Sequence, residues 1–210
     1  MKLMLVGASG LVGQQVQRLA LADPGIDRVI APTRKPLAPA ARLDNPVVDF
    51  ERLPTQAPWW KVDAVICTLG TTMAQAGSEA AFRRVDYDYP LAIAKLALAA
   101  GAGAFALNSA LGAAAGSRVF YNRVKGEAED AIIALNYPSL TLVRPSLLDG
   151  GPRPDGRPGE RVALIFARGL RPLIPARYRA VATEAVARTL LAAALAREPG
   201  VHIIESEGIG

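Results

Sequence analysis

The sequence contains very little cysteine and histidine. Its 210 residues include one cysteine, Cys67, and one histidine, His202. A single thiol excludes a disulfide within the chain, and a single imidazole leaves zinc sites and Ser–His–Asp triads without their usual ligands and bases. We therefore expect no metal site, and we interpret Cys67 and His202 as structural residues of strands.

Long apolar runs are lacking as well. The N-terminal run, residues 3–6, is far shorter than the apolar core of a secretory leader, and residues 90–107 are interrupted by Lys95 and by glycines. Neither stretch suits a membrane-spanning helix or a leader. We expect no membrane association, and the low cysteine content favours a cytoplasmic location.

Charge of one sign is in small excess only. Lys and Arg number 24 against 19 Asp and Glu, a net charge of +5, and the arginines are spread along the chain. A nucleic-acid-binding surface needs clustered positive charge, so we expect no nucleic-acid partner. With 51% hydrophobic and 20% charged residues, the composition is typical of a soluble globular protein, and the length suits a single domain spanning residues 1–210.

Short apolar runs alternate with alanine-rich stretches along the first half of the chain. This alternation predicts an α/β fold of the Rossmann type, with a doubly wound, mainly parallel sheet and helices on both faces. The expected strands are residues 3–6, 28–31, 46–49, 63–68, 104–108, 140–144 and 201–204, and the expected helices are residues 11–22, 87–100, 118–135 and 183–197. Thr183 is the expected N-cap of the last helix. Residues 145–180, rich in proline, glycine and arginine, are expected to form an irregular substrate-side excursion with a short helix at 161–169.

Glycines recur at a fixed spacing directly after the first expected strand. Gly7, Gly10 and Gly13 form a G-x-x-G-x-x-G pattern that opens the first expected helix. The first glycines allow a tight turn and close approach of a pyrophosphate, and the last allows the helix to pack closely on the strand. The helix N-terminus supplies amide donors to the phosphates. The pattern predicts a dinucleotide-binding turn.

An acidic residue that would select NAD is missing from the end of the second expected strand. NAD-selective Rossmann proteins carry it about twenty residues beyond the last glycine, where it binds the ribose 2′-hydroxyl. Arg34 and Lys35 occupy this place. A guanidinium pairs with a 2′-phosphate, so the sequence predicts NADP(H) in preference to NAD(H). The ends of the next strands are expected to frame the adenine and ribose with Asp49, Phe50, Thr68, Leu69 and Gly70.

A Tyr-x-x-x-Lys pattern lies on the expected helix 118–135, at Tyr121 and Lys125. The i, i+4 spacing puts both side chains on one helix face, where the ammonium can stabilise the phenolate and reach the nicotinamide ribose. Ser109 follows the fifth expected strand, at the sheet edge where ligands gather in doubly wound folds. Its hydroxyl can hydrogen-bond a substrate carbonyl beside Tyr121.

These motifs, in this order and at this spacing, resemble the short-chain dehydrogenase/reductase superfamily. Finer segments are similar to one atypical branch: CTLGTT from Cys67, VDYDYPLAIAKLALAAGA from Val85, YNRVKGEAE from Tyr121 and LVRPSLLDG from Leu142. That branch contains NAD(P)H-binding proteins similar to the Tat-interacting oxidoreductase-like protein and related nucleoside-diphosphate-sugar epimerases.

The resemblance implies roles for individual residues. Ser109 would orient a carbonyl, Tyr121 would donate and accept the proton, and Lys125 would activate Tyr121. The residues implied to hold NADP are Gly7, Ser9, Gly10, Leu11, Val12, Arg34, Thr68, Leu69, Gly70 and Lys125, and those implied to lie beside the nicotinamide are Pro145, Ser146 and Leu147.

We therefore expect an NADP(H)-dependent oxidoreductase that transfers hydride between the nicotinamide and a small carbonyl or alcohol substrate. Two alternatives stay open: an NADP(H)-binding regulatory or sensor protein with little catalysis, and a sugar-nucleotide epimerase or dehydratase. The last needs a pocket for a nucleoside diphosphate, with positive charge from Arg153, Arg157, Arg161, Arg168 and Arg171. Neither the substrate's identity nor the choice between monomer and homodimer follows from the sequence.

Overall fold

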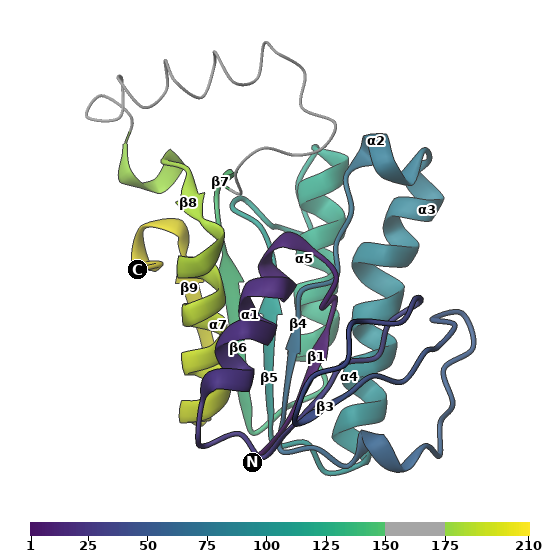
Figure 1. Cartoon of the computed structure of the whole chain (residues 1–210). Helices are drawn as coiled ribbons and strands as arrows, with labels where there is room; N and C mark the ends of the chain where they lie inside the picture. The colour runs from purple at the N-terminus through teal and green to yellow at the C-terminus, as the bar shows by residue number, and fades with distance from the viewer. Residues whose placement is uncertain (150–174) are drawn as a thin grey trace.

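The computed structural model describes residues 1–149 and 175–210, and its centre is a parallel sheet (Figure 1). The strands of this sheet are β1 (Lys2–Val6), β2 (Arg28–Ile30), β3 (Leu43–Asp44), β4 (Ala64–Cys67), β5 (Ala104–Asn108), β6 (Ser139–Arg144) and β9 (Gly200–Glu205). Their order is β3-β2-β1-β4-β5-β6-β9, and every neighbouring pair is parallel. The winding direction reverses between β1 and β4. Ligands of such sheets bind at the carboxyl ends of the strands where the winding reverses.

Helices cover both faces of the sheet, which confirms the predicted Rossmann-type α/β fold. They are α1 (Leu11–Ala22), α2 (Met73–Ala76), α3 (Glu79–Arg83), α4 (Tyr89–Ala99), α5 (Phe120–Ile133) and α7 (Thr183–Ala196). Figure 1 shows α1 and α7 side by side on one face, with α4 and α5 on the other. In β1 the alternation of side chains follows these layers: Leu3 and Leu5 pack toward α1 and α7, and Met4 and Val6 pack toward α4.

The strand expected at residues 46–49 is wrong in its position. The third strand is Leu43–Asp44, and beyond it only an isolated bridge joins Thr33 to Val47. Pro46 explains the difference, because it has no N–H to donate to the Ala31 carbonyl in a continuing parallel ladder. The side-chain amide of Asn45 donates to that carbonyl instead, at 2.5 Å.

The helix expected at residues 87–100 begins earlier in the structure. It is preceded without interruption by α3 and by a π-helical turn, η2 (Arg84–Asp88), and Ser78 caps α3 by accepting a hydrogen bond from Ala81 N at 3.2 Å. A wider π turn fits the position, because Pro90 cannot donate an ordinary helical hydrogen bond. Gly101 follows the end of α4 with a φ of 100°, as a C-terminal glycine does.

Thr183 is not the N-cap of α7. The cap is Ala182, without a side-chain capping hydrogen bond, and Thr183 is the first helical residue. The reason is that a short strand, β8 (Val181–Ala182), pairs in parallel with β7 (Leu148–Asp149) and runs directly into the helix. The helix expected at 161–169 lies outside the described residues.

Gly126 in α5 lets the helix backbone touch the loop that follows β5. A Cβ at this position would lie 2.2 Å from the backbone carbon of Ala114 and 2.2 Å from the backbone nitrogen of Ala115. These contacts are with backbone atoms, which cannot swing aside as a flexible side chain can. The loop that carries Ser109 is therefore seated on α5 through a glycine.

We expect Gly126→Ala to destabilise the protein by about 1–3 kcal/mol, because overpacking has a cost of that order. An alanine normally stabilises a helix by about 0.5–1 kcal/mol relative to glycine, so the sign is opposite to the helix-propensity effect. Urea unfolding followed by circular dichroism measures the difference. Gly116→Ala is the matched control, since a Cβ there meets no atom within 4 Å. Equal stability of the two variants would contradict the packing argument.

Candidate functional site

The turn between β1 and α1 consists of backbone with almost no side chain. Gly7 has a φ of 89°, and its carbonyl accepts a hydrogen bond from Gly10 N at 2.9 Å. A Cβ on Gly13 would lie 2.1 Å from the Gly7 oxygen, so α1 begins against the turn only because residue 13 is glycine. The first turn of α1 has no acidic side chain, and its N-cap Gly10 makes no side-chain capping bond. The positive end of this helix therefore favours an anion.

The end of β4 lies directly against this turn. A Cβ on Gly7 would be 2.6 Å from Thr68 Oγ1, and that hydroxyl donates to the Val6 carbonyl at 3.0 Å. Leu11 is exposed, whereas the side chain of Val12 is buried in the core. Val12 can thus contribute only its backbone amide to a ligand at the helix end.

A pocket of about 520 Å³ opens beside the turn. Its lining residues come from the ends of separate strands and are Gly7, Ser9, Pro32, Thr33, Arg34, Lys35, Pro36, Leu37, Phe50 and Leu69. The structure therefore brings together residues that the sequence analysis chose from distant parts of the chain. Asp49 stays outside: its exposed carboxylate accepts a hydrogen bond from Glu51 N at 2.9 Å.

Arg34 and Lys35 are exposed at the rim of this pocket. In the part of the chain that the structure describes, neither side chain forms an ion pair with a carboxylate. Among the described residues, no acidic side chain lines the pocket. This end of the site is therefore a place where positive charge has no partner within the described protein.

Asn45 fixes the loop that carries these cations, and the sequence analysis missed it. Its side-chain amide donates to the Ala31 carbonyl and, at 2.7 Å, to Thr33 Oγ1, while its carbonyl accepts from Leu37 N at 2.8 Å. Residues before and after Arg34 are thus held by one side chain. The sequence pattern that could have revealed Asn45 is its position directly before Pro46. An asparagine there can use its side-chain amide in place of the N–H that proline lacks.

Lys125 is paired with a buried acid that the sequence analysis also missed. Its Nζ lies 2.8 Å from Asp86 Oδ1, and the two side chains are 7% and 0% exposed. The second carboxylate oxygen of Asp86 accepts a hydrogen bond from Thr71 N at 2.9 Å. A Cβ on Gly70 would lie 3.3 Å from Asp86 Oδ1 and 3.6 Å from Lys125 Nζ. The ion pair therefore sits directly under the loop that follows β4.

Two opposing effects act on the pKa of Lys125. Burial would lower it, but the negative charge of Asp86, aided by the Tyr121 oxygen and the bond to Asp86, raises it above its ordinary value. Lys125 is therefore charged at neutral pH although it is buried.

Tyr121 and Ser109 lie near the two ends of the same loop, between β5 and α5. The Tyr121 ring packs on Phe82, with 5.4 Å between ring centroids, and Phe82 is fully buried. Ser109 is 5% exposed, and its Oγ has no hydrogen-bond partner among the described residues. The neighbouring Asn108 Oδ1 is likewise buried and unpaired. Buried polar atoms without partners are uncommon in proteins, so these oxygens mark a place where a polar ligand would fit.

The end of β6 is fixed by charge. Arg144 donates through Nε to Glu129 Oε1 at 3.1 Å and through Nη1 to Glu205 Oε1 at 2.9 Å. The hydrogen bonds that Arg144 donates to Glu129 and Glu205 raise its pKa, although its partial burial opposes this. Helix α5 and strand β9 are thereby joined to the strand end that precedes Pro145.

The residues predicted to lie beside a nicotinamide differ in exposure. The Pro145 carbonyl accepts from Leu111 N at 2.9 Å, and Pro145 is buried. Ser146 Oγ donates to the Arg179 carbonyl, and Leu147 is 76% exposed. Pro145 thus touches the loop from Ser109, whereas Leu147 is open to solvent.

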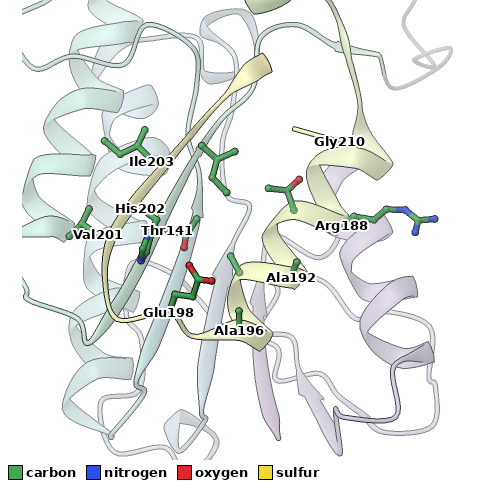
Figure 2. Close-up of a pocket in the computed structure, with 12 residues that line it drawn as sticks. Thr141, Arg188, Ala192, Ala196, Glu198, Val201, His202, Ile203 and Gly210 are labelled. Carbon is green, nitrogen blue, oxygen red and sulfur yellow. The ribbon is translucent and has the colours of Figure 1, made fainter. Parts of the chain in front are cut away.

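A larger pocket, about 670 Å³, lies between α7 and the edge strand β9 (Figure 2). His202 and Thr141 line it from the sheet, and Ala192 and Ala196 line it from α7. His202 Nε2 is 3.1 Å from the Pro199 carbonyl. None of the described residues that line this pocket is one predicted to bind cofactor or substrate.

Cys67 is the last residue of β4 and is fully buried. Burial raises the pKa of its thiol to about 12. The thiol is therefore unreactive at neutral pH, in keeping with a structural residue.

The comparisons with known proteins find relatives that share most of the chain. It is 33% identical over 176 residues to protein fmp52 of Emericella nidulans, which covers 79% of this chain and 74% of that protein. It is 36% identical over 167 residues to protein HTATIP2 of Rattus norvegicus, which covers 77% of this chain and 68% of that protein. No protein-family model matches the chain.

Solved structures share the fold at lower identity. The protein MoeE5, solved in complex with UDP-glucose and NAD, has a TM-score of 0.72 at 17% identity and covers 97% of this chain and 75% of its own. A UDP-glucose 4-epimerase from Thermotoga maritima, solved with UDP-glucose, has a TM-score of 0.68 at 19% identity. The match covers 99% of this chain and 77% of the epimerase chain. These likenesses concern the fold.

The expected cytoplasmic location is contradicted by the same relatives. The FMP52 proteins of Emericella nidulans, Candida albicans and Lodderomyces elongisporus are named as mitochondrial. A low cysteine content argues against a disulfide framework, but it does not identify a compartment. Within residues 1–149 and 175–210, no helix combines the length and apolar character needed to cross a membrane.

The chain is more than 30% identical to the fmp52 and HTATIP2 proteins over more than two thirds of their length. The doubly wound sheet and the glycine turn point to the same family. The chain therefore belongs to the atypical short-chain dehydrogenase/reductase family, with an oxidoreductase- and epimerase-like NAD(P)-binding fold, in the branch that contains HTATIP2 and FMP52.

Proposed function

We propose that this protein binds NADP(H) in preference to NAD(H). The observation that carries the proposal is the pocket of about 520 Å³ in which Arg34 and Lys35 lie beside Gly7 and Ser9, with no acidic residue among the described lining residues. A 2′-phosphate would meet unpaired cations there, whereas a free 2′-hydroxyl would find no carboxylate to accept its hydrogen bond. The described residues fit a dinucleotide, because the glycine turn exposes backbone amides to its phosphates and Phe50 and Leu69 offer apolar surface.

The proposed reaction is hydride transfer between the nicotinamide and a small carbonyl or alcohol. When bound, the nicotinamide supplies or accepts the hydride, which no side chain can do. Tyr121 gives its phenolic proton to the carbonyl oxygen in reduction and receives it back in oxidation. The unpaired Ser109 hydroxyl orients that oxygen, and the charged Lys125 stabilises the phenolate. The substrate-side excursion expected at residues 145–180 lies largely outside the described residues, which end at 149 and resume at 175.

A second candidate is a regulatory or sensor protein that binds NADP(H) with little catalysis. The contact between Lys125 and Asp86 favours it, because a neutral ion pair stabilises a neighbouring phenolate less than a free cation does. Turnover on a broad panel of carbonyl compounds distinguishes the two. Tight NADPH binding without any turnover supports the sensor.

A sugar-nucleotide epimerase or dehydratase is the third candidate. Its support is the likeness of the fold to MoeE5 and to the Thermotoga maritima epimerase, both of which were solved with UDP-glucose. The arginines that could bind a nucleoside diphosphate, Arg153, Arg157, Arg161, Arg168 and Arg171, lie outside the described residues. Conversion of a UDP-sugar without net consumption of cofactor would favour this candidate over the oxidoreductase.

We expect Arg34→Ala to weaken NADPH binding by about tenfold or more and to leave NADH binding within about twofold, since a charge-assisted hydrogen bond has an energy of about 1.5–3 kcal/mol. Fluorescence titration with both nucleotides measures the two affinities. Arg52→Ala is the matched control, because Arg52 is also exposed but does not line the pocket. Equal loss of both nucleotides in Arg34→Ala would show that Arg34 does not recognise the 2′-phosphate.

We expect Asn45→Ala to reduce the ratio of NADPH to NADH affinity by about threefold to tenfold. The substitution removes the hydrogen bonds that hold residues 31–37, so the loop no longer presents Arg34 in a fixed place. The same titrations measure the ratio, and thermal unfolding controls for general damage. A variant that loses stability but keeps the wild-type ratio would limit Asn45 to a structural role.

We expect Tyr121→Phe to keep NADPH affinity within about twofold and to reduce turnover by about a hundredfold or more, the usual range for loss of a general acid. The packing of the ring on Phe82 is preserved, so the fold should be intact. NADPH oxidation with a panel of small aldehydes and ketones measures turnover. Unchanged turnover would remove Tyr121 from the mechanism.

A further inference from the structure

Asp86 is buried beside the predicted catalytic lysine, Lys125, and has no role in the proposed reaction. It lies in the π-helical turn η2, with 0% of its side chain exposed, and both its carboxylate oxygens are engaged. One faces Lys125 Nζ at 2.8 Å, and the other accepts from Thr71 N at 2.9 Å. π-Helical turns of this kind frequently occur at functional sites.

The residues around the ion pair of Asp86 and Lys125 show which part of the site the Lys125 ammonium faces. Gly70 is exposed, and a side chain there would come within 3.3 Å of Asp86 and 3.6 Å of Lys125. The ammonium is thus covered on that side by a glycine in the loop predicted to contact the cofactor. Lys125 lies one helical turn after Tyr121 on α5. The pair is placed between the candidate catalytic tyrosine and the candidate cofactor loop.

We propose that Asp86 is a positioning residue for the nicotinamide half of the site: its buried carboxylate keeps Lys125 protonated and holds the ammonium against Gly70, where it can donate to the cofactor's ribose. The proposal rests on the proposed binding of NADP(H) for its ligand, but the protonation of Lys125 is a property of the free protein.

The balance of groups around Lys125 supports this role. Within residues 1–149 and 175–210, the ionisable groups that act on it are Asp86 from η2, Tyr121 from its own helix and Cys67 from β4. Cys67 is a neutral thiol at neutral pH, because burial raises its pKa to about 12. Asp86 is therefore the one full negative charge among these groups. Without it, a buried ammonium is destabilised and tends to lose its proton.

The first test is Asp86→Asn, which keeps the shape of the side chain and an oxygen for Thr71 N but removes the charge. Asp88→Asn is the matched control: Asp88 is in the same turn but exposed. Isothermal titration calorimetry with NADP⁺ is carried out from about pH 5.5 to about pH 9, a range that brackets a lowered lysine pKa. At each pH the dissociation constant of Asp86→Asn is divided by that of Asp88→Asn. This ratio cancels the effect of the titration of the ligand's own phosphate, which is the same for both variants.

The expected result is a ratio that rises by about tenfold or more toward high pH, as Lys125 of Asp86→Asn loses its proton and its hydrogen bond to the ribose. Addition of Lys125→Met should abolish this pH dependence. A constant ratio across the range overturns the proposal. If neither the wild-type protein nor Asp88→Asn binds NADP⁺, the proposed function fails, and the test of Asp86 passes to the second measurement.

The second measurement needs no cofactor and also covers a variant that is poorly stable at neutral pH. In Asp86→Asn the folded state would lower the pKa of Lys125 below its unfolded value, so the unfolded state binds more protons and stability rises with pH. Urea unfolding should therefore show Asp86→Asn gaining stability relative to Asp88→Asn between about pH 6 and about pH 9. A difference between the variants that does not change with pH overturns the proposal.

Discussion

The backbone of β1 can turn into α1 beside β4 only because the residues that meet there lack bulky side chains. A methyl group at residue 13 would clash with the Gly7 carbonyl oxygen, and one at residue 7 would clash with Thr68. The contact fixes the distance between two strand ends and a helix end at once. Gly7 also lines the pocket that contains Arg34 and Phe50, and the loop that follows Thr68 carries Gly70, which lies over the ion pair of Lys125 and Asp86. The steric requirement at Gly7 and Gly13 therefore holds together the strand ends on which the candidate cofactor pocket is built.

The fold followed from the sequence wherever a local pattern was sufficient. Buried strands such as Leu3–Val6 and helices that begin at a glycine turn carry their periodicity in adjacent residues. The third strand did not follow, because Pro46 lacks the N–H that would continue the ladder from Leu43–Asp44, so residues 46–49 keep only the isolated bridge between Thr33 and Val47. The start of α7 did not follow either: Thr183 has a capping side chain, but pairing of Ala182 with Asp149 decides where the helix begins. In both cases a hydrogen bond to a distant segment overrode the local preference.

In the candidate site, too, residues in local motifs could be predicted from the sequence, and residues that act through distant partners could not. Motifs with internal spacing, such as Gly7 to Gly13 and Tyr121 with Lys125, could be recognised from the sequence alone. Asp86 and Asn45 could not, because each acts through partners that the fold supplies: Asp86 through Lys125, and Asn45 through Ala31 and Thr33. An acid in a helical segment and an asparagine before a proline are common in sequences. Only burial and contact distinguish these two from the exposed acids and turn residues around them.

The two ends of the site use positive charge in opposite ways. Arg34 and Lys35 are exposed, and water solvates them well enough that they need no carboxylate in the free protein. Lys125 is buried, so it can stay charged only beside Asp86. A ligand phosphate can therefore compete for the exposed cations without breaking an existing ion pair, whereas any group that binds Lys125 must share it with Asp86. It follows that a substitution at Arg34 leaves the ion pair beside Tyr121 intact, whereas a substitution at Asp86 or Lys125 changes the charges around Tyr121.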